Sequence, residues 1–464
     1  MKVRIKNCRV PFLIFTFFSF SSAILKGQDI NNNLRTLDNN HNLASDTSDW
    51  RFFRSIKEIR LSGKNSSPHI SFGGEIREQI RIYHNLNYGD TKPPNDIYLQ
   101  QRYMLHFDLF INKNLRFFTQ LNATDVSGKN NISLNDRENL DFSQAFLDIG
   151  FNTLSSRFRF GRQELCYGSE RILGPRDGPN NRQTYDGAKY TLILEKLTGD
   201  FILVNPVMFQ PGPFDNIRAK NYLILAGYWT LSLANKNIID LYYFGTTRKY
   251  ATEIAGNTTE KRHSMGVRIE KSSNRYFYDI EGTLQKGTYQ NQHISGWHFT
   301  SIIGYQWRNL TMRPTIQIKG SVFSGNKDST DNQINSFRPI SAKPPVNEML
   351  PVGPTNIILL IPEGEINITN NLGLTLKYSV IWRLRRTDGL YSTDMERMIR
   401  PPDKPGENNG NYVAGGPGFE MNYTGGKHFE ISITTGYFIP GKYVKKTGNG
   451  KDLQALSLKA YYRF

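Results

Sequence analysis

The sequence predicts an all-β fold, a single closed antiparallel transmembrane β-barrel of about 18 strands with long extracellular loops. Segments of about ten residues in which every second side chain is apolar predict strands long enough to cross a membrane. Beyond residue 27 the longest unbroken aliphatic run, 357–361, has five residues, whereas a membrane helix needs about 20. The last segment, 458–464, also alternates and ends in Phe464, which is typical of outer-membrane barrels.

The chain is predicted to divide into three parts. Residues 1–27 combine a basic start, a short Phe-rich apolar stretch and small residues, which predicts a secretory signal peptide. Residues 28–69 form a polar periplasmic lead and the start of the barrel, and residues 70–464 form the transmembrane β-barrel. The formal charge of +17 is spread over single basic residues within strand-like segments, which favours a lined surface over a nucleic-acid tail.

Three segments illustrate the two-faced strands, namely 102–111, 372–383 and 428–438. In the first, Tyr103 and Leu105 share one parity and Arg102 lies on the other. Such segments are longer than the usual strands of soluble sheets, which run to about 5 to 6 residues. Aromatic groups at 242–244, 276–278 and 461–464 are expected to form an interfacial girdle. A closed barrel leaves no unpaired strand edge in lipid.

Strand number and loops follow from spacing. About 395 residues remain from Ile70 onward, and at about 22 residues for each strand and connection they make about 18 strands. Two polar stretches rich in Pro and Gly, 325–356 and 386–418, are too long for turns. Long connections of such barrels normally lie on the extracellular side, where they can fold over or into the pore.

Several blocks resemble the alginate export family of outer-membrane barrels. The most specific is 159–187, which reads RFGRQELCYGSERILGPRDGPNNRQTYDG. The others are 72–78 (FGGEIRE), 98–109 (YLQQRYMLHFDL), 337–339, 351–357 (PVGPTNI), 381–391 (IWRLRRTDGLY) and 436–444 (GYFIPGKYV). The resemblance implies an 18-stranded barrel with a narrow, arginine-rich, electropositive pore through which an acidic polysaccharide passes outward.

Arginine is the side chain best suited to bind the carboxylates of an anionic sugar polymer, because its rigid fork stays charged at every ordinary pH. Parity places some arginines on the lumen face, and the family block 159–187 contains others in a loop-like segment that is a candidate constriction. The predicted pore-lining and anion-binding set is Arg77, Arg102, Arg162, Arg171, Arg176, Arg182, Arg383 and Arg385. The alternative is that these arginines brace the lumen by pairing with acids such as Glu75, Asp108, Asp186 and Asp388, and both roles can hold at once.

Arg162 departs from this pattern. It shares the parity of Phe158 and Phe160, so simple alternation directs it toward lipid, where a charge costs about 2 to 4 kcal/mol at the midplane. A bulge at Gly161 or a position at the rim of the barrel would resolve the conflict.

The predicted function is a channel in the cell outer membrane that passes an anionic polysaccharide or oligosaccharide, as in alginate export. The alternative is a general or anion-selective porin for uptake of small solutes, and a third class is a barrel enzyme or adhesin. The eight His are scattered without metal-ligand spacing. Paired acids such as Glu363 with Glu365 are interpreted as solvated charges of the lumen. We therefore expect no catalysis, cofactor or metal. The expected partners are outer-membrane lipid, an anionic polysaccharide or small anionic solutes, and possible periplasmic export machinery, with no nucleic acid.

Overall fold

Long two-faced strands make up most of the protein. The computed structural model describes residues 55–57, 59–61, 68–151, 155–252, 256–272, 275–328, 330–346, 349–350 and 352–464. The predicted signal peptide, 1–27, and most of the predicted lead, 28–69, lie outside the described residues. The first long strand begins at His69, one residue before the predicted start of the barrel.

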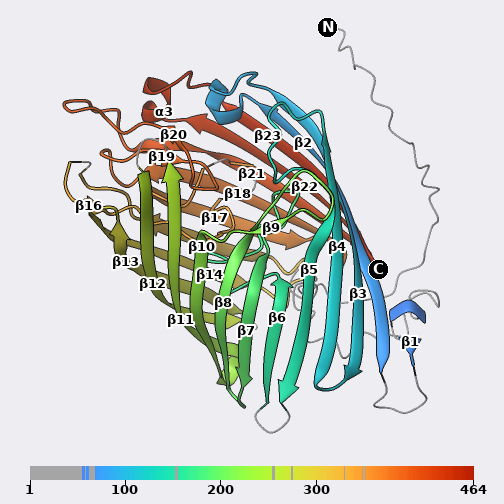
Figure 1. The fold of residues 1–464 in the computed structure, drawn as a ribbon. Coiled ribbons are helices and arrows are strands. Elements are labelled where there is room, and N and C mark those ends of the chain that lie inside the picture. The colour runs from blue at the N-terminus through green and yellow to red at the C-terminus, as the bar shows by residue number, and fades with distance from the viewer. Residues whose placement is uncertain are drawn as a thin grey trace.

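Eighteen strands form one closed antiparallel wall, as predicted (Figure 1). They are β2 (His69–His84), β3 (Asp96–Asn112), β4 (Leu115–Ser127), β5 (Glu138–Phe151), β6 (Ser156–Gln163), β7 (Tyr185–Ile193), β8 (Leu197–Met208), β10 (Tyr222–Leu233), β11 (Asn237–Thr252), β12 (Gly256–Ser272), β13 (Tyr276–Tyr289), β14 (Gln292–Gln306), β15 (Thr315–Phe323), β17 (Ile357–Asn367), β18 (Leu372–Arg383), β21 (Tyr412–Gly425), β22 (Phe429–Pro440) and β23 (Leu453–Arg463).

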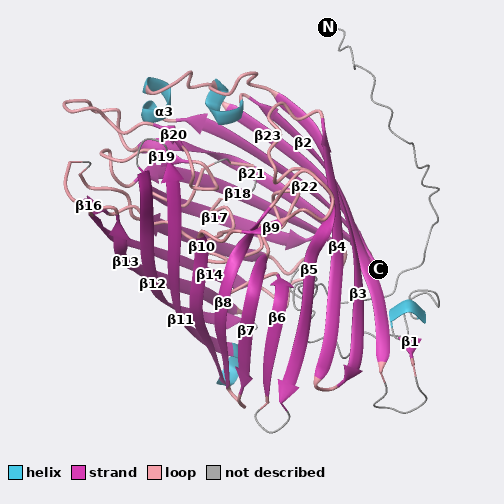
Figure 2. Cartoon of the chain, viewed as in Figure 1, coloured by secondary structure: helices cyan, strands magenta, loops and turns pink. Residues whose placement is uncertain are grey.

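The other elements are short, and Figure 2 shows only a few short helical segments beside the strands of the wall. These short elements are the strands β1 (Ile59–Arg60), β9 (Ile217–Arg218), β16 (Gln333–Ile334), β19 (Leu390–Tyr391) and β20 (Met398–Arg400), the 3-10 turns η3 (Leu86–Gly89) and η4 (Ala234–Lys236), and the helix α3 (Lys442–Lys446). Within the described residues no helix is long and apolar enough to cross a membrane.

Pairing between β2 and β23 closes the wall. Ile76 lies opposite Tyr462, and Ile82 lies opposite Leu456. The ladder ends in two backbone hydrogen bonds, from the N–H of Gly74 to the carbonyl of Phe464 (2.9 Å) and from the N–H of Phe464 to the carbonyl of Gly74 (3.1 Å). Closure satisfies the backbone groups that would otherwise be unpaired in hydrocarbon.

The predicted alternation divides the wall into two faces. On β2, Ile76 and Ile80 are 38% and 42% exposed on the outer face, whereas Arg77 and Gln79 are buried on the inner face. The aromatic group at 242–244 was expected in the outer girdle, and this expectation is wrong for two of its members. Tyr242 and Phe244 point inward and are buried, because loops packed inside the barrel cover them.

The two ends of the wall differ in their connections. One end carries short turns, such as 113–114 between β3 and β4. The other carries the long connections, including 164–184 between β6 and β7, 324–356 between β15 and β17, and 384–411 between β18 and β21. In barrels of this architecture the long connections face the outside of the cell. Figure 1 shows these connections crossing the inside of the barrel.

We expect deletion of Phe464 to impair assembly more than conductance, because it removes two backbone hydrogen bonds at the closing seam but no lumen charge. Assembly is measured as the fraction of protein that keeps its heat-resistant, fast-migrating band after membrane insertion, and conductance is measured per channel in planar bilayers. Normal assembly of the truncated chain would contradict this account of the seam.

Candidate functional site in the barrel lumen

The residues 164–184, called here the first inner loop, enter the lumen between two short strands. Gly161 on β6 lies opposite Gly187 on β7, with φ values of 127° and 157°. A Cβ at either glycine would lie 2.2 Å from a backbone oxygen of the adjacent strand. Glycine at both positions therefore allows the close backbone approach at the point where the chain leaves the wall.

Arginines of β2 bind the backbone of the first inner loop. Arg77 donates to the carbonyls of Asp177 (2.7 Å) and Pro179 (3.3 Å) and to the Asn180 side chain (2.8 Å). Arg81 donates to the carbonyl of Gly178 (2.8 Å). Arg77 has no exposed surface, so its guanidinium holds the loop against the wall and does not face the solvent of the lumen.

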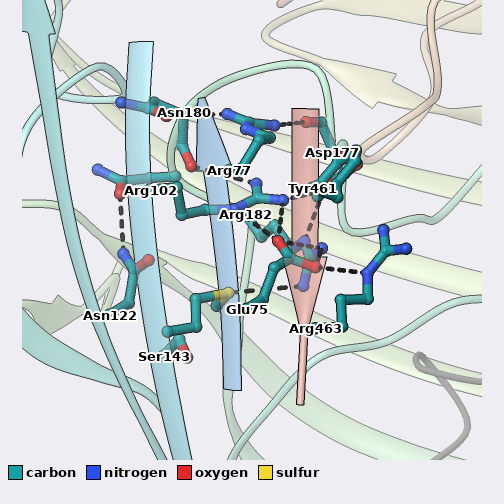
Figure 3. A network of polar contacts seen from close by, with 12 residues as sticks. Glu75, Arg77, Arg102, Asn122, Ser143, Asp177, Asn180, Arg182, Tyr461 and Arg463 are labelled. Atoms are coloured by element: carbon teal, nitrogen blue, oxygen red, sulfur yellow. Dashed lines mark hydrogen bonds and ion pairs between the residues drawn. The ribbon is translucent and has the colours of Figure 1, made fainter. Parts of the chain in front are cut away.

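Glu75 is the centre of an ion-pair network beneath this loop (Figure 3). Arg102 contacts both Glu75 (2.7 Å) and Asp177 (2.8 Å). Arg182 contacts the same two acids, at 3.3 and 2.6 Å, and Arg463 reaches Glu75 from β23 (3.3 Å). Arg182 also contacts Glu164 (3.8 Å), and Arg463 also contacts Glu430 on β22 (3.0 Å). The network therefore ties the inner loop to β2, β3, β22 and β23.

A second network joins the first inner loop to the opposite side of the wall. Arg171 contacts Asp279 (3.2 Å) and Glu281 (2.9 Å) on β13. Arg268 on β12 contacts Asp279 and also Asp240 on β11, both at 2.9 Å. The inner loop is therefore held by ion pairs on both sides.

Two further connections lie inside the barrel, namely 324–356 and 384–411, called here the second and third inner loops. The second packs on the first, and the third packs on the second. Gly174 donates its backbone N–H to the carbonyl of Ser341 (2.7 Å), and Asn356 donates to the carbonyls of Arg385 (2.9 Å) and Asp388 (3.0 Å). Buried apolar side chains fill the space between the loops and the wall, among them Leu173, Phe337, Leu350 and Leu390. The three loops therefore narrow the lumen as one packed unit.

Arg383 and Arg385 differ from one another despite their shared parity. Arg383 has no exposed surface, because it pairs with Asp403 (2.5 Å) and stacks on the ring of Tyr443 (3.8 Å). It does not face water, contrary to the sequence-based expectation, since the third inner loop covers it. Arg385 is exposed, and its side chain has no hydrogen bond or ion pair with the residues that the structure describes.

Arg162 does not lie in the lumen, so the structure contradicts its place in the predicted set. It is paired in the ladder with Ala145 and Asp186 on the outer face, and β6 ends one residue later. Its guanidinium contacts Asp186 (2.8 Å) and Asp141 (3.2 Å). Of the two solutions considered, the rim position applies, because the described ladder from β6 to β7 continues past Gly161 without a register shift.

Arg176 is the cation of the first inner loop that has no partner among the described residues. Its Nε is buried without a hydrogen bond, and its side chain is half-buried. Burial lowers the pKa of Arg176, an effect opposed by the charge of Asp394. Arginine nevertheless stays charged at neutral pH, so Arg176 places a positive charge in the narrowed lumen without a direct ion pair to the described residues.

A small lumen pocket, with a cavity volume of about 10 Å³, is lined by three more arginines, Arg248, Arg262 and Arg338. Glu396 of the third inner loop bridges two of them, with one carboxylate oxygen 2.7 Å from both Arg248 and Arg338. Tyr222 also lines the pocket. We call the pair Arg248 and Arg338 the arginine fork.

Sequence reasoning missed this fork. A signal was present, because Arg248 shares the inward parity of Tyr242 and Phe244, and Arg338 lies in the block 337–339 that resembles the family. Their convergence depends on the path of the second inner loop, which residue spacing does not give.

A family model for alginate export matches residues 69–455. The chain belongs to the alginate export family. The protein is accordingly an outer-membrane channel. No curated protein is significantly similar to the sequence.

Solved porins share this fold at low sequence identity. OccK11 (OpdR) of Pseudomonas aeruginosa superposes with a TM-score of 0.54 and 12% identity, over 88% of this chain and 99% of that chain. OccK2 (OpdF) of the same organism, solved in complex with glucuronate, gives 0.57 and 8%, over 85% and 98%. OccAB3 of Acinetobacter baumannii gives 0.57 and 9%, over 85% and 99%. At these identities the likeness shows the fold.

We expect Glu75→Gln to lower the free energy of unfolding by about 3 to 5 kcal/mol, because it leaves Arg102 and Arg182 buried with one fewer counter-charge. Denaturant unfolding of the barrel in detergent measures this change. Glu78→Gln is the matched control, since Glu78 lies on the outer face and accepts from exposed Tyr103. The control should cost less than about 1 kcal/mol. Equal effects would contradict a special role for the Glu75 network.

Proposed function

We propose that this outer-membrane channel passes carboxylate-bearing saccharides, such as an alginate-like polysaccharide or its oligosaccharides, by electrostatically assisted diffusion without catalysis. The observation that carries the proposal is the arginine fork. Glu396 places a carboxylate between two guanidinium groups in the lumen, so the fork fits the group that each uronate residue would present. The family membership and the glucuronate complex of OccK2 support the same substrate class.

The exposed fractions of the fork suit exchange between partners. The side chains of Arg248 and Arg338 are 28% and 23% exposed, and that of Glu396 is 49% exposed. Partly exposed ion pairs contribute only about 0.2 to 1 kcal/mol each. A passing carboxylate can therefore replace Glu396 without a large barrier, and weak contacts of this kind let a chain move on.

A second candidate function is uptake of small anionic solutes. The packing of the three inner loops favours it, because buried ion pairs and apolar contacts narrow the lumen and would have to rearrange for a wide polymer. Planar-bilayer recordings distinguish the two functions. A polysaccharide channel should be blocked by polyuronate at concentrations far below those of monomeric glucuronate, whereas a small-solute porin should respond to both at similar uronate concentrations.

Removing the charge of Arg176 should reduce anion selectivity. One unit charge about 5 Å from a passing ion attracts an anion, and repels a cation, by about 0.8 kcal/mol even at the dielectric constant of water. The two effects together correspond to about sixteenfold in the anion-to-cation permeability ratio. Reversal potentials in a salt gradient measure this ratio for Arg176→Gln. Arg137→Gln is the control, since Arg137 is 52% exposed and pairs with exposed Asp125. An unchanged ratio for Arg176→Gln would remove Arg176 from the conducting path.

Glu396→Gln should make the channel easier to block by uronates. The substitution frees the arginine fork from its internal carboxylate, so the half-blocking concentration should fall by about twofold to tenfold, as two partly exposed ion pairs allow. Glu407→Gln is the control, because Glu407 lies in the same loop but contacts Asn409 and backbone. An unchanged half-blocking concentration for Glu396→Gln would refute binding at the fork.

A further inference from the structure

Three carboxylates meet at the rim of the barrel, away from the arginine fork. Glu138 and Asp141 belong to β5, and Asp215 belongs to the connection 209–221, which leads from β8 to β10. One carboxylate oxygen from each residue lies within 4.8 Å of the other two. The cluster thus joins a strand of the wall to a connection about 75 residues away in sequence.

The geometry leaves two carboxylate oxygens of this cluster buried without a donor. Glu138 is 1% exposed, and its Oε2 accepts from the Asn216 side chain (2.7 Å), whereas its Oε1 has no partner. Asp215 follows the same pattern, since its Oδ2 accepts from the Gly212 N–H (2.8 Å) and its Oδ1 is buried without a partner. In each side chain one carboxylate oxygen accepts a hydrogen bond, and the other has no donor.

The cation that contacts this cluster does not balance it. Arg162 lies 3.2 Å from Asp141, but it is shared with Asp186, which it contacts at 2.8 Å. One guanidinium therefore faces four carboxylates when all are ionised. Buried carboxylate oxygens that lack a donor, in a cluster whose charge is not balanced, are stabilised by a proton or a bound cation.

We propose that Glu138, Asp141 and Asp215 form a Ca²⁺ site that fastens the connection 209–221 to the rim. Ca²⁺ takes carboxylate oxygens at about 2.3 to 2.6 Å in irregular geometry, so oxygens up to about 4.8 Å apart fit around one ion. Mg²⁺ demands about 2.0 to 2.1 Å and near-ideal octahedral geometry, which suits three separated carboxylates less well. The site is distinct from the arginine fork, and the proposed ion would stabilise the rim of the channel rather than contact the solute.

The metal would order the rim where Arg162 lies. Asn216 follows Asp215 and accepts from Arg162 through its carbonyl (3.0 Å), and its N–H donates to Asp141 (2.9 Å). Holding Asp215 on the ion therefore holds these contacts as well. Phe214, on the other side of Asp215, packs on Phe142 of β5 with 5.4 Å between ring centroids.

The test is Ca²⁺ binding by the full-length protein in detergent after treatment with EDTA. Isothermal titration should give one site with a dissociation constant of about 0.1 to 1 mM, the range of extracellular calcium modules. Addition of 10 mM CaCl₂ should raise the melting temperature, and 10 mM MgCl₂ should raise it by less than half as much.

Two variants make the test specific. Asp215→Asn and Glu138→Gln should each weaken Ca²⁺ binding at least tenfold, whereas Asp125→Asn, which removes an exposed carboxylate of β4 that pairs with Arg137, should bind as wild type does. Asp215→Asn lies outside the wall, so it keeps the test decisive if Glu138→Gln assembles poorly. The proposal is overturned if wild type shows no binding up to 10 mM, if Mg²⁺ acts as strongly as Ca²⁺, or if Asp215→Asn binds as wild type does. Ca²⁺ binding is measured independently of solute passage, so failure of the proposed function would leave its outcome unchanged.

Discussion

The protein depends on one constraint, which is that every backbone donor and acceptor in the hydrocarbon must be paired within the wall. Pairing of β2 with β23 meets it, because it removes the two edges that an open sheet would present. Closure also fixes two environments for the side chains of each strand. Apolar residues such as Ile76 and Ile80 face outward, and the residues between them face a separate interior in which charged groups can be arranged.

Arginines of this interior serve two different ends. Arg77, Arg102 and Arg383 have no exposed surface, and their hydrogen bonds and ion pairs hold inner loops in place. Arg176, Arg248 and Arg338 keep exposed surface in the lumen. The first three arginines, all from the predicted set, therefore brace the lumen. The proposed contact with solutes depends on Arg176 from that set and on Arg248 and Arg338, which the sequence did not single out.

Alternation predicted the parts of this structure that depend on local periodicity. It gave the wall and the inward direction of Arg77 and Arg102. The polar composition rich in Pro and Gly gave the long connections 325–356 and 386–418, although the second ends at 411, where β21 begins. Alternation also gave the outward direction of Arg162, but it could not choose between a bulge and a rim position, because that depends on where the strand stops, and β6 stops at Gln163.

Contacts made by the inner loops also lay beyond prediction. Arg338 and Glu396 lie in different loops and meet Arg248 of the wall, so their convergence depends on the paths of two long connections. The inward packing of Tyr242 and Phe244 has the same cause, since loop residues inside the barrel provide an apolar environment there. Residue spacing carries information about neighbours along a strand and little about partners that a loop brings from far away.

The seam between β2 and β23 also has a consequence for how the chain folds. Every other ladder of the wall joins two of the eighteen strands that are consecutive along the chain, so those strand pairs can form without bringing the two ends of the chain together. Glu75 and Arg463 are nearly the whole barrel sequence apart, and the entropy of bringing such distant segments together grows with the intervening length. Folding kinetics should therefore be dominated by one late encounter between the first and last long strands, after the other strand pairs have already formed.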